Sequence, residues 1–212
     1  IAFARENGVD FVGISFVESA DHIAAIRGII DDNWPRIVSK IENQNSLDNM
    51  EEVIEATDVV MIDRGDLSVE TNLESVTIFQ KRILSTSATY GKPVIVATEM
   101  LHTMIDNPYP TKAEISDISN AVLDGAAATM LSGETAVGEN PIEAVSVMRR
   151  VNTITENHLH DSLDADSPQV DTSIPQVMGQ AVALICRSLP ITKIVAVTIS
   201  GFAARTVAAQ RP

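Results

Sequence analysis

The chain has 212 residues, of which 45% are hydrophobic and 21% are charged, and its formal net charge is −14. This length allows one sizeable core and part of a second. The acidic balance, with no basic patch, argues against a nucleic-acid partner. No apolar run approaches the ~18 residues of a membrane span. The single cysteine, Cys186, excludes an intrachain disulfide and fits a reducing, cytoplasmic location.

Strand-like and helix-like segments alternate with short connections, which predicts parallel βα units. The first helix is expected over residues 2–7, so the chain opens inside a helix and reads as an internal piece of a longer polypeptide. Strands are expected over residues 9–16, 36–42, 59–63, 94–98 and 128–131. Further helices are expected over residues 20–30, 47–56, 72–90, 112–124 and 141–159. Five such units are too few for a closed eight-stranded barrel, and they would also suit an open doubly wound sheet.

A polar segment with several aspartates and Pro168 follows, over residues 161–173. It predicts a linker between residues 1–160, which hold the βα units, and residues 174–212. In the last part, a helix over 175–188, a strand over 194–198 and a helix over 202–209 are expected. This pattern predicts the start of a second α/β domain.

Charged residues follow two neighbouring strands of the first part. Lys40 and Glu42 come at the end of one strand, and Arg64-Gly65-Asp66 comes directly after the next. Residues just past strand ends line the catalytic face of an α/β barrel. Two carboxylates and a cation there predict a site for a divalent metal, with Glu42 and Asp66 as ligands, and for an anionic substrate. The alternatives are a plain ion pair and solvated or helix-capping acids.

Three more strand ends carry polar residues. Thr98 could place a hydroxyl at the same face or cap the following helix. The run Ser132-Gly133-Glu134-Thr135 could line that face or simply make a turn. The loop Thr198-Ile199-Ser200-Gly201 precedes a helix and is a candidate phosphate cradle, and therefore a candidate effector loop.

In order and spacing, these residues resemble the pyruvate kinase family. The matching strings are Ser39-Lys40-Ile41-Glu42-Asn43, Arg64-Gly65-Asp66-Leu67 with Val69-Glu70, Gly91-Lys92-Pro93-Val94-Ile95, Ala97-Thr98, Pro110-Thr111 with Ala113-Glu114, Asn120-Ala121-Val122-Leu123-Asp124-Gly125-Ala126, and Met130-Leu131-Ser132-Gly133-Glu134-Thr135-Ala136. The resemblance implies a partial TIM (β/α)8 barrel made of units four to eight. The first three strands and an inserted lid domain would lie outside this chain, and the last part would begin an allosteric C-terminal domain.

The resemblance also implies phosphoryl transfer from phosphoenolpyruvate to ADP, giving pyruvate and ATP in glycolysis. By the family's pattern, Lys40 would neutralise the phosphoryl group in flight. Glu42 and Asp66 would hold Mg²⁺ or Mn²⁺. Arg64 and the backbone near Gly65 and Asp66 would bind the substrate.

The remaining roles that the resemblance implies concern the other strand ends and the whole protein. Thr98 would lie near the carbon that becomes protonated, and Ser132 and Glu134 would support a proton-delivering water network. The full-length enzyme would need K⁺, would form a homotetramer and would have no nucleic-acid or membrane partner. This chain alone would be inactive, because the K⁺ ligands and several nucleotide contacts would lie outside it.

Some positions depart from the family's pattern. Asp63 stands where an alanine is usual and is expected either to repel the substrate carboxylate or to pair with Arg64. Phe202 and Ala203 replace hydroxyl residues, which argues against activation by fructose bisphosphate and leaves another phosphorylated effector open. Ser68, Glu99 and Val137 replace a usual glycine, glutamine and lysine.

Two other functions fit the same residues. A carbon–carbon lyase of the phosphoenolpyruvate/pyruvate barrel type would use a similar metal pair, but it would not depend on ADP. A catalytically degenerate paralogue acting as a binding module is the second, and the departures Asp63 and Glu99 support it. The string from Ser132 to Ala136 favours the kinase over the lyase.

Overall fold

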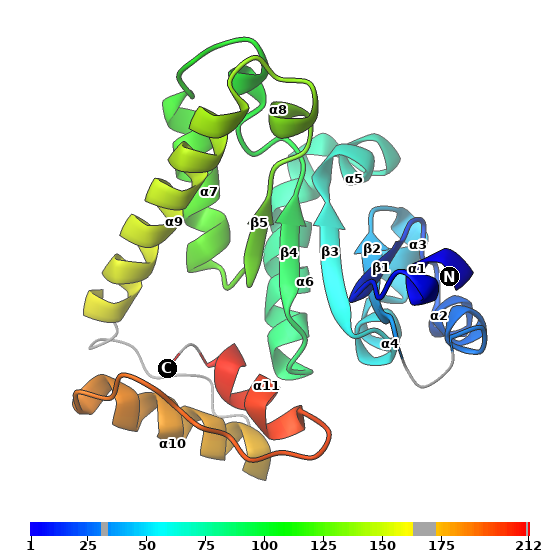
Figure 1. The fold of residues 1–212 in the computed structure, drawn as a ribbon, viewed down its shortest axis with the longest axis vertical. Helices are drawn as coiled ribbons and strands as arrows, with labels where there is room; N and C mark the ends of the chain where they lie inside the picture. Colours follow the sequence, from blue (N-terminus) through cyan, green and yellow to red (C-terminus); the bar gives the residue numbers. More distant parts are fainter. Residues whose placement is uncertain (31–33, 163–172, 211) are drawn as a thin grey trace.

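The five predicted strands form one parallel sheet. The computed structural model describes residues 1–30, 34–162, 173–210 and 212. The strands lie in the sequential order β1-β2-β3-β4-β5, and Figure 1 shows them side by side. They are β1 (Phe11–Ile14), β2 (Arg36–Ile41), β3 (Val59–Asp63), β4 (Val94–Ala97) and β5 (Ala128–Met130). A doubly wound sheet reverses its strand order at a switch point, so the sequential order is that of a barrel.

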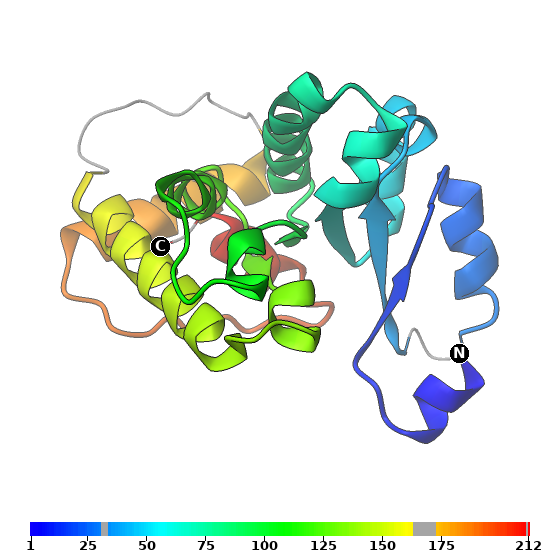
Figure 2. The ribbon, with the colours of Figure 1, turned by 90° about the horizontal axis from the view of Figure 1, so that it is seen from above.

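Helices connect the strands and cover one side of the sheet. Seen from above, the strands make an arc and the helices lie along its outer side (Figure 2). The helices are α1 (Ala2–Glu6), α2 (Ala20–Arg27), α3 (Gln44–Asp48), α4 (Met50–Ala56), α5 (Arg64–Glu70), α6 (Val76–Thr89), α7 (Lys112–Leu123), α8 (Gly133–Ala136) and α9 (Pro141–Ser162), with 3-10 turns η2 (Leu73–Ser75) and η3 (His102–Ile105). The strand edges β1 and β5 do not meet within the described sheet.

The core lies between the sheet and the outer helices. Ile37 in β2, Ile62 in β3, Ile83 in α6 and Ile118 in α7 are fully buried. β-Branched residues suit pleated strands that are covered on both faces. Local signals fix the helix starts. At α7, for example, Thr111 and Glu114 form a reciprocal capping box. Packing and capping together therefore hold the strand ends in place.

Two predicted helices differ from their expected bounds. The helix expected over 47–56 is two helices, α3 and α4, which meet at Asn49, whose backbone leaves helical geometry (φ −103°, ψ 25°). The helix expected over 72–90 begins with the 3-10 turn η2 and continues as α6. Hydrophobic periodicity continues through such breaks and does not reveal them.

The last part contains two helices, α10 (Ile174–Ser188) and α11 (Phe202–Ala209), which pack on each other beyond the amino ends of the strands (Figure 1). The strand expected over 194–198 is wrong for the described structure. Val195 and Val197 are 89% and 96% exposed, and no described strand pairs with this segment. A strand needs a neighbour to satisfy its backbone, so an apolar run alone does not make one.

The predicted linker over 161–173 falls mostly on residues 163–172, which lie outside the described residues. The proposed domain bounds therefore stay a prediction. Within the described ranges, none of the helices is both long and apolar enough to cross a membrane.

Candidate active site

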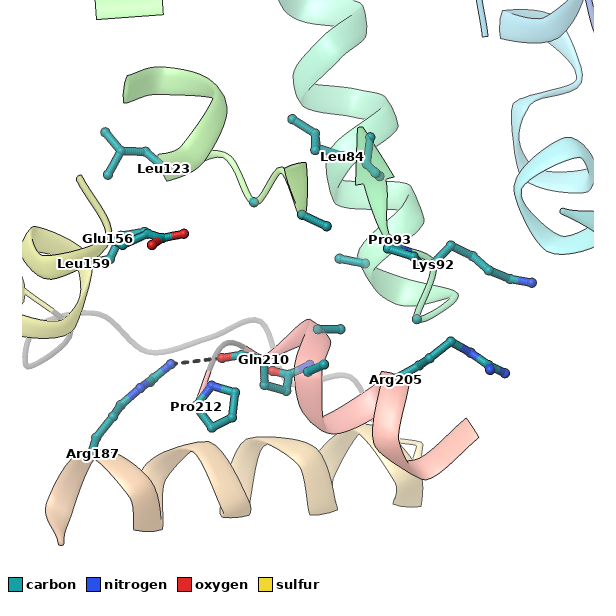
Figure 3. A pocket seen from close by; sticks show the side chains of 17 residues that line it. Leu84, Lys92, Pro93, Leu123, Glu156, Leu159, Arg187, Arg205, Gln210 and Pro212 are labelled. Carbon is teal, nitrogen blue, oxygen red and sulfur yellow. Dashed lines mark hydrogen bonds between the residues drawn. The ribbon is translucent and has the colours of Figure 1, made fainter. Parts of the chain in front are cut away.

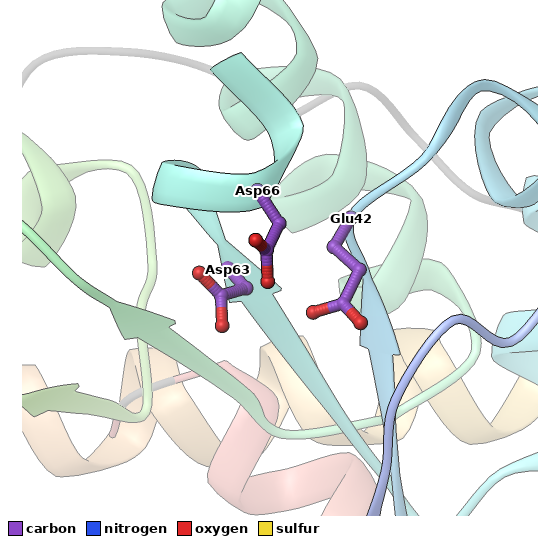
Figure 4. Close-up of side chains that lie close together, drawn as sticks. All are labelled: Glu42, Asp63 and Asp66. Carbon is purple, nitrogen blue, oxygen red and sulfur yellow. The ribbon is translucent and has the colours of Figure 1, made fainter. Parts of the chain in front are cut away.

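A lysine and three carboxylates meet at the carboxyl ends of β2 and β3. Parallel pairing places Lys40 beside Met61 and Ile41 beside Ile62. One residue further along both strands, the same register brings Glu42 next to Asp63. Asp66, in the first turn of α5, leans over both (Figure 4). The predicted grouping of Lys40, Glu42 and Asp66 is therefore present.

Lys40 is the centre of this cluster. Its Nζ lies 2.7 Å from Glu42 Oε2, 2.9 Å from Asp63 Oδ2 and 4.0 Å from Asp66 Oδ2. Ser15, which follows β1, accepts a hydrogen bond from the same Nζ at 3.5 Å. Burial lowers the pKa of Lys40, but the contacts with Glu42 and Asp63 outweigh burial and raise it. Lys40 is therefore an ammonium at neutral pH and can oppose negative charge, but it cannot serve as a base.

The three carboxylates fit a divalent cation. One oxygen from each of Glu42, Asp63 and Asp66 lies within 4.8 Å of the others. Mg²⁺ takes oxygen ligands and commonly uses one or two carboxylates, leaving positions for substrate and water. Glu42 is fully buried, and its Oε1 accepts the backbone N–H of Phe16 at 2.7 Å. This contact fixes the direction of the Glu42 side chain, as contacts around a metal ligand usually do.

Asp63 pairs with Lys40 and not with Arg64. Of the two outcomes expected for this acid, pairing with Arg64 is wrong, because the Arg64 guanidinium points elsewhere. Its Nη1 donates to Asp117 Oδ2 at 2.6 Å and its Nη2 donates to the carbonyl of Thr98 at 2.7 Å. The Asp63 carboxylate therefore lies in the cluster with Lys40, Glu42 and Asp66.

Arg64 is buried, with 7% of its surface exposed. Besides the two contacts above, its Nε donates to the Thr98 carbonyl at 3.3 Å. Thr98 and Glu99 both adopt left-handed backbone, with φ of 67° and 55°. Such φ values are uncommon and costly outside glycine. The fork of Arg64 therefore stabilises the turn after β4, and its donors are used within the protein.

Thr98 connects the end of β4 to the start of α5. Its Oγ1 accepts the N–H of Gly65 at 2.8 Å and donates to the carbonyl of Ala97 at 2.6 Å. A Cβ on Gly65 would lie 3.6 Å from Thr98 Oγ1 and 3.6 Å from Asp63 Oδ1. The Thr98 hydroxyl thus accepts a backbone N–H from the first turn of α5. It caps α5 and not the helix that follows β4.

Glu134 connects the loops after β4 and β5. The side chain is buried, with 2% exposed. Its Oε1 accepts the N–H of Leu101 at 2.9 Å and its Oε2 accepts the N–H of Ser132 at 2.8 Å. Ser132 directly precedes α8. Both carboxylate oxygens therefore hold the loops in position.

The candidate effector loop lies at the other end of the sheet. Gly201, with φ of 76°, precedes α11, and the Arg205 side chain donates to the carbonyl of Ser200 at 3.2 Å. Thr198 lies earlier in the same exposed loop. A cavity of about 670 Å³ separates α11 from the amino ends of β4 and β5, and Figure 3 shows its lining residues, among them Leu84, Leu123 and Arg187.

Lys92 borders this cavity, but its ammonium group is hydrogen-bonded to backbone carbonyls. Its Nζ donates to the carbonyls of Glu55 and Thr57 at 2.9 and 2.6 Å. Burial lowers its pKa; Asp58 opposes this effect, whereas Arg205 and Arg27 add to it. The Lys92 side chain thus connects the start of β4 to the end of α4.

Sequence reasoning missed three contributors to the site. The loop after β1 supplies Ser15 and the N–H of Phe16. The strand predicted over 9–16 included both residues, whereas β1 ends at Ile14. Asp117 partners Arg64 across 53 residues of chain, for which the sequence carries no signal. Asp63 was expected to repel the substrate carboxylate or to pair with Arg64, and its contact with Lys40 was not predicted.

A sequential parallel sheet with a lysine and three carboxylates at its carboxyl edge has the arrangement of part of an α/β barrel, and its acidic cluster could hold a metal ion. Comparison with known proteins gives the family. The sequence model described as "Pyruvate kinase, barrel domain" matches residues 1–145. The chain belongs to the pyruvate kinase family.

Two relatives and one solved structure illustrate the match. The chain is 42% identical to a pyruvate kinase of Bacillus licheniformis, covering 100% of this chain and 37% of that protein. It is 41% identical to one of Agrobacterium vitis, covering 100% and 44%. The crystal structure of a pyruvate kinase from Cryptosporidium parvum superposes with a TM-score of 0.87 at 33% identity, covering 100% of this chain and 46% of that one. The chain thus spans less than half the length of each of these proteins.

Proposed function

We propose that the full-length protein transfers the phosphoryl group of phosphoenolpyruvate to ADP, giving ATP and, after uptake of one proton, pyruvate in glycolysis. The supporting observation is Lys40 at 2.7–2.9 Å from two buried carboxylates at the carboxyl edge of a barrel-type sheet. This edge is where catalytic residues of such barrels gather. Membership of the pyruvate kinase family adds the reaction class.

In this proposal Lys40 opposes the charge of the phosphoryl group during transfer. Its pKa is raised, so the ammonium is present throughout the neutral range without a proton being moved. Phosphoryl transfer depends mainly on positioning and charge neutralisation, and a fixed ammonium supplies both. Glu42 and Asp66 would hold Mg²⁺ or Mn²⁺, which when bound supplies Lewis-acid stabilisation of the substrate oxygens.

The remaining residues are assigned by position. Thr98 is proposed to lie near the enolate carbon, where its hydroxyl orients the group that delivers the proton. Backbone N–H groups near Gly65 and Asp66 are proposed to receive the substrate carboxylate, which requires the Gly65 N–H to leave Thr98 Oγ1. Arg64 was expected to bind the substrate and Glu134 to support the proton-delivering network. We propose instead that both act by positioning, because their polar atoms are used in buried hydrogen bonds. Ser132 stays a candidate for the proton-delivering network.

Properties of the whole protein are also part of the proposal. K⁺ dependence, a homotetramer, a cytoplasmic location and the binding of ADP and ATP are expected of the full-length enzyme. The 212-residue chain alone is expected to be inactive, because it spans 37% of its relative from Bacillus licheniformis. Turnover by the isolated chain would contradict this expectation.

The loop with Thr198, Ser200 and Gly201 is proposed to bind a phosphorylated effector.

Product analysis tests the reaction. Full-length protein is incubated with phosphoenolpyruvate, Mg²⁺ and K⁺, with and without ADP, and pyruvate and ATP are measured together. Equal amounts of both, only with ADP, are expected. Pyruvate or a cleavage product formed without ADP would favour a lyase, and binding of Mn²⁺ and phosphoenolpyruvate without any product would favour a degenerate binding paralogue.

A further inference from the structure

Lys40 is shared between carboxylates from two neighbouring strands. Glu42, which follows β2, lies on one side at 2.7 Å and Asp63, the last residue of β3, lies on the other at 2.9 Å. Glu42 is 0% exposed and Asp63 is 8% exposed. The Lys40 side chain is 19% exposed, and an ammonium between two buried acids has its donors directed at them. Lys40 is thus held back against the strand ends.

The charges of the cluster do not balance. Glu42, Asp63 and Asp66 carry three negative charges, Lys40 carries one positive charge, and the sum is −2. An approaching phosphate or carboxylate meets this negative site in a partly water-excluded setting, where repulsion is stronger than in bulk water. One divalent cation would bring the sum to zero. Without the Asp63 charge, the corresponding sums would be −1 and +1.

The geometry points to Asp63 as a positioning residue that holds Lys40 at the strand ends, strengthens the binding of the divalent cation and weakens the binding of the anionic substrate. This inference rests on the proposed function, because it concerns the same lysine and the same cation. Asp63 raises cation affinity by adding a third nearby carboxylate oxygen, and it weakens anion affinity by holding the ammonium and adding negative charge. Removal of the Asp63 charge should therefore shift the two affinities in opposite directions.

Other contacts do not account for the Asp63 carboxylate. The donors of its neighbour Arg64 go to Asp117 and Thr98. Asp63 ends β3 and directly precedes α5, but its side chain makes no cap to that helix. Its Oδ2 instead contacts Lys40, and one of its oxygens lies within 4.8 Å of an oxygen of Glu42 and of Asp66 (Figure 4). A role in setting the position and charge of the lysine follows from this placement.

Binding measurements on the full-length protein test the inference. Titration calorimetry gives the affinity for Mn²⁺ alone, and then for phosphoenolpyruvate at saturating Mn²⁺, in wild type, Asp63→Asn and Asp63→Glu. Asp63→Asn is expected to weaken Mn²⁺ about tenfold and to tighten phosphoenolpyruvate severalfold, in line with one charge lost near each ligand. Asp63→Glu keeps the charge and is expected to keep most of the Mn²⁺ affinity.

Asp10→Asn is the matched control. Asp10 is exposed and precedes β1 at the opposite end of the sheet, so the same change of charge there should move neither affinity by more than about twofold. Asp63→Ala, which removes the same charge with a smaller side chain, is measured alongside, and thermal unfolding verifies that each variant is folded.

The inference is overturned if Asp63→Asn and Asp63→Ala leave both affinities unchanged. It is equally overturned if they weaken phosphoenolpyruvate at saturating Mn²⁺, because Asp63 would then assist substrate binding. Failure of the proposed function gives a different result. In that case the wild-type protein itself would form no pyruvate with ADP, whatever Asp63 does to Mn²⁺.

Discussion

Replacing Arg64 by lysine tests how the turn after β4 is stabilised. The guanidinium makes two hydrogen bonds to the Thr98 carbonyl, at 2.7 and 3.3 Å, and one to Asp117 at 2.6 Å. A lysine ammonium keeps the charge and can reach one of these partners, but it lacks the planar fork that serves both. The left-handed backbone at Thr98 and Glu99 then loses its main support.

The expected cost follows from these contacts. A hydrogen bond that involves a charged group contributes ~1.5–3 kcal/mol, and loss of the Thr98 contacts should therefore cost ~2 kcal/mol. The ion pair between Arg64 and Asp117 adds little to this cost, because 37% of the Asp117 side chain is exposed and exposed ion pairs contribute little to stability. At ~2 °C or more per kcal/mol for a large domain, Tm should fall by ~4 °C or more.

The assay is thermal unfolding of full-length Arg64→Lys beside Arg150→Lys. Arg150 forms an exposed pair with Glu143 at 2.8 Å, for which the same exchange should shift Tm by less than ~1 °C. Because Thr98 lies at the proposed site, turnover by Arg64→Lys should also fall, without a matching change in Mn²⁺ affinity. Equal Tm values for the two variants would refute the role given to Arg64.

Three further substitutions have expected outcomes. Glu42→Gln should weaken Mn²⁺ binding, measured by calorimetry, by at least the roughly tenfold that losing even an outer contact costs a metal site. Glu134→Gln should lower Tm by ~2 °C or more, because the new NH₂ group would face a backbone N–H of Leu101 or Ser132. For Glu114, burial opposes ionisation, but hydrogen bonds from Thr103 and Thr111 outweigh it and lower the pKa. This carboxylate therefore stabilises the fold above the unfolded pKa of ~4.3 and loses that effect as the pH falls through its lower folded pKa. Glu114→Gln should accordingly lower Tm at pH 7 but not near pH 2.

Each of these expectations has a clear contrary result. Unchanged Mn²⁺ affinity in Glu42→Gln would remove Glu42 from the cation site. An unchanged Tm in Glu134→Gln would show that the loop after β5 can rearrange without cost. A Tm difference for Glu114→Gln that stays constant from pH 7 to pH 2 would mean that the effect is not due to ionisation.

The centre of the sheet could be predicted from the sequence because β2, β3 and β4 are short runs rich in Val and Ile with polar residues at or just past their ends. Strand β3 has the predicted bounds, Val59–Asp63. The prediction of a strand over 194–198 is wrong because an apolar pattern alone does not form a strand. Pairing needs a neighbouring strand, and the described residues supply none for this segment. Periodicity identifies a segment that can pair, whereas the partner belongs to the tertiary structure.

The site was predictable where it follows strand ends and unpredictable where it depends on contacts across the sheet. Lys40, Glu42 and Asp66 follow adjacent strands and come together as expected. Arg64 is adjacent to them in sequence, yet its side chain turns to Asp117 and the turn after β4. The direction of a side chain depends on packing, which sequence spacing alone does not give.

We propose that Lys40 and its carboxylates form a phosphoryl-transfer site. The most direct test is ADP-dependent pyruvate formation by the full-length protein, its Lys40→Met variant and a Lys81→Met control, in which an exposed lysine paired with Asp124 is replaced. We expect activity in the wild type and the control, and a loss of about a thousandfold or more in Lys40→Met, comparable to removing a principal charge-stabilising group. Near wild-type activity in Lys40→Met would contradict the claim.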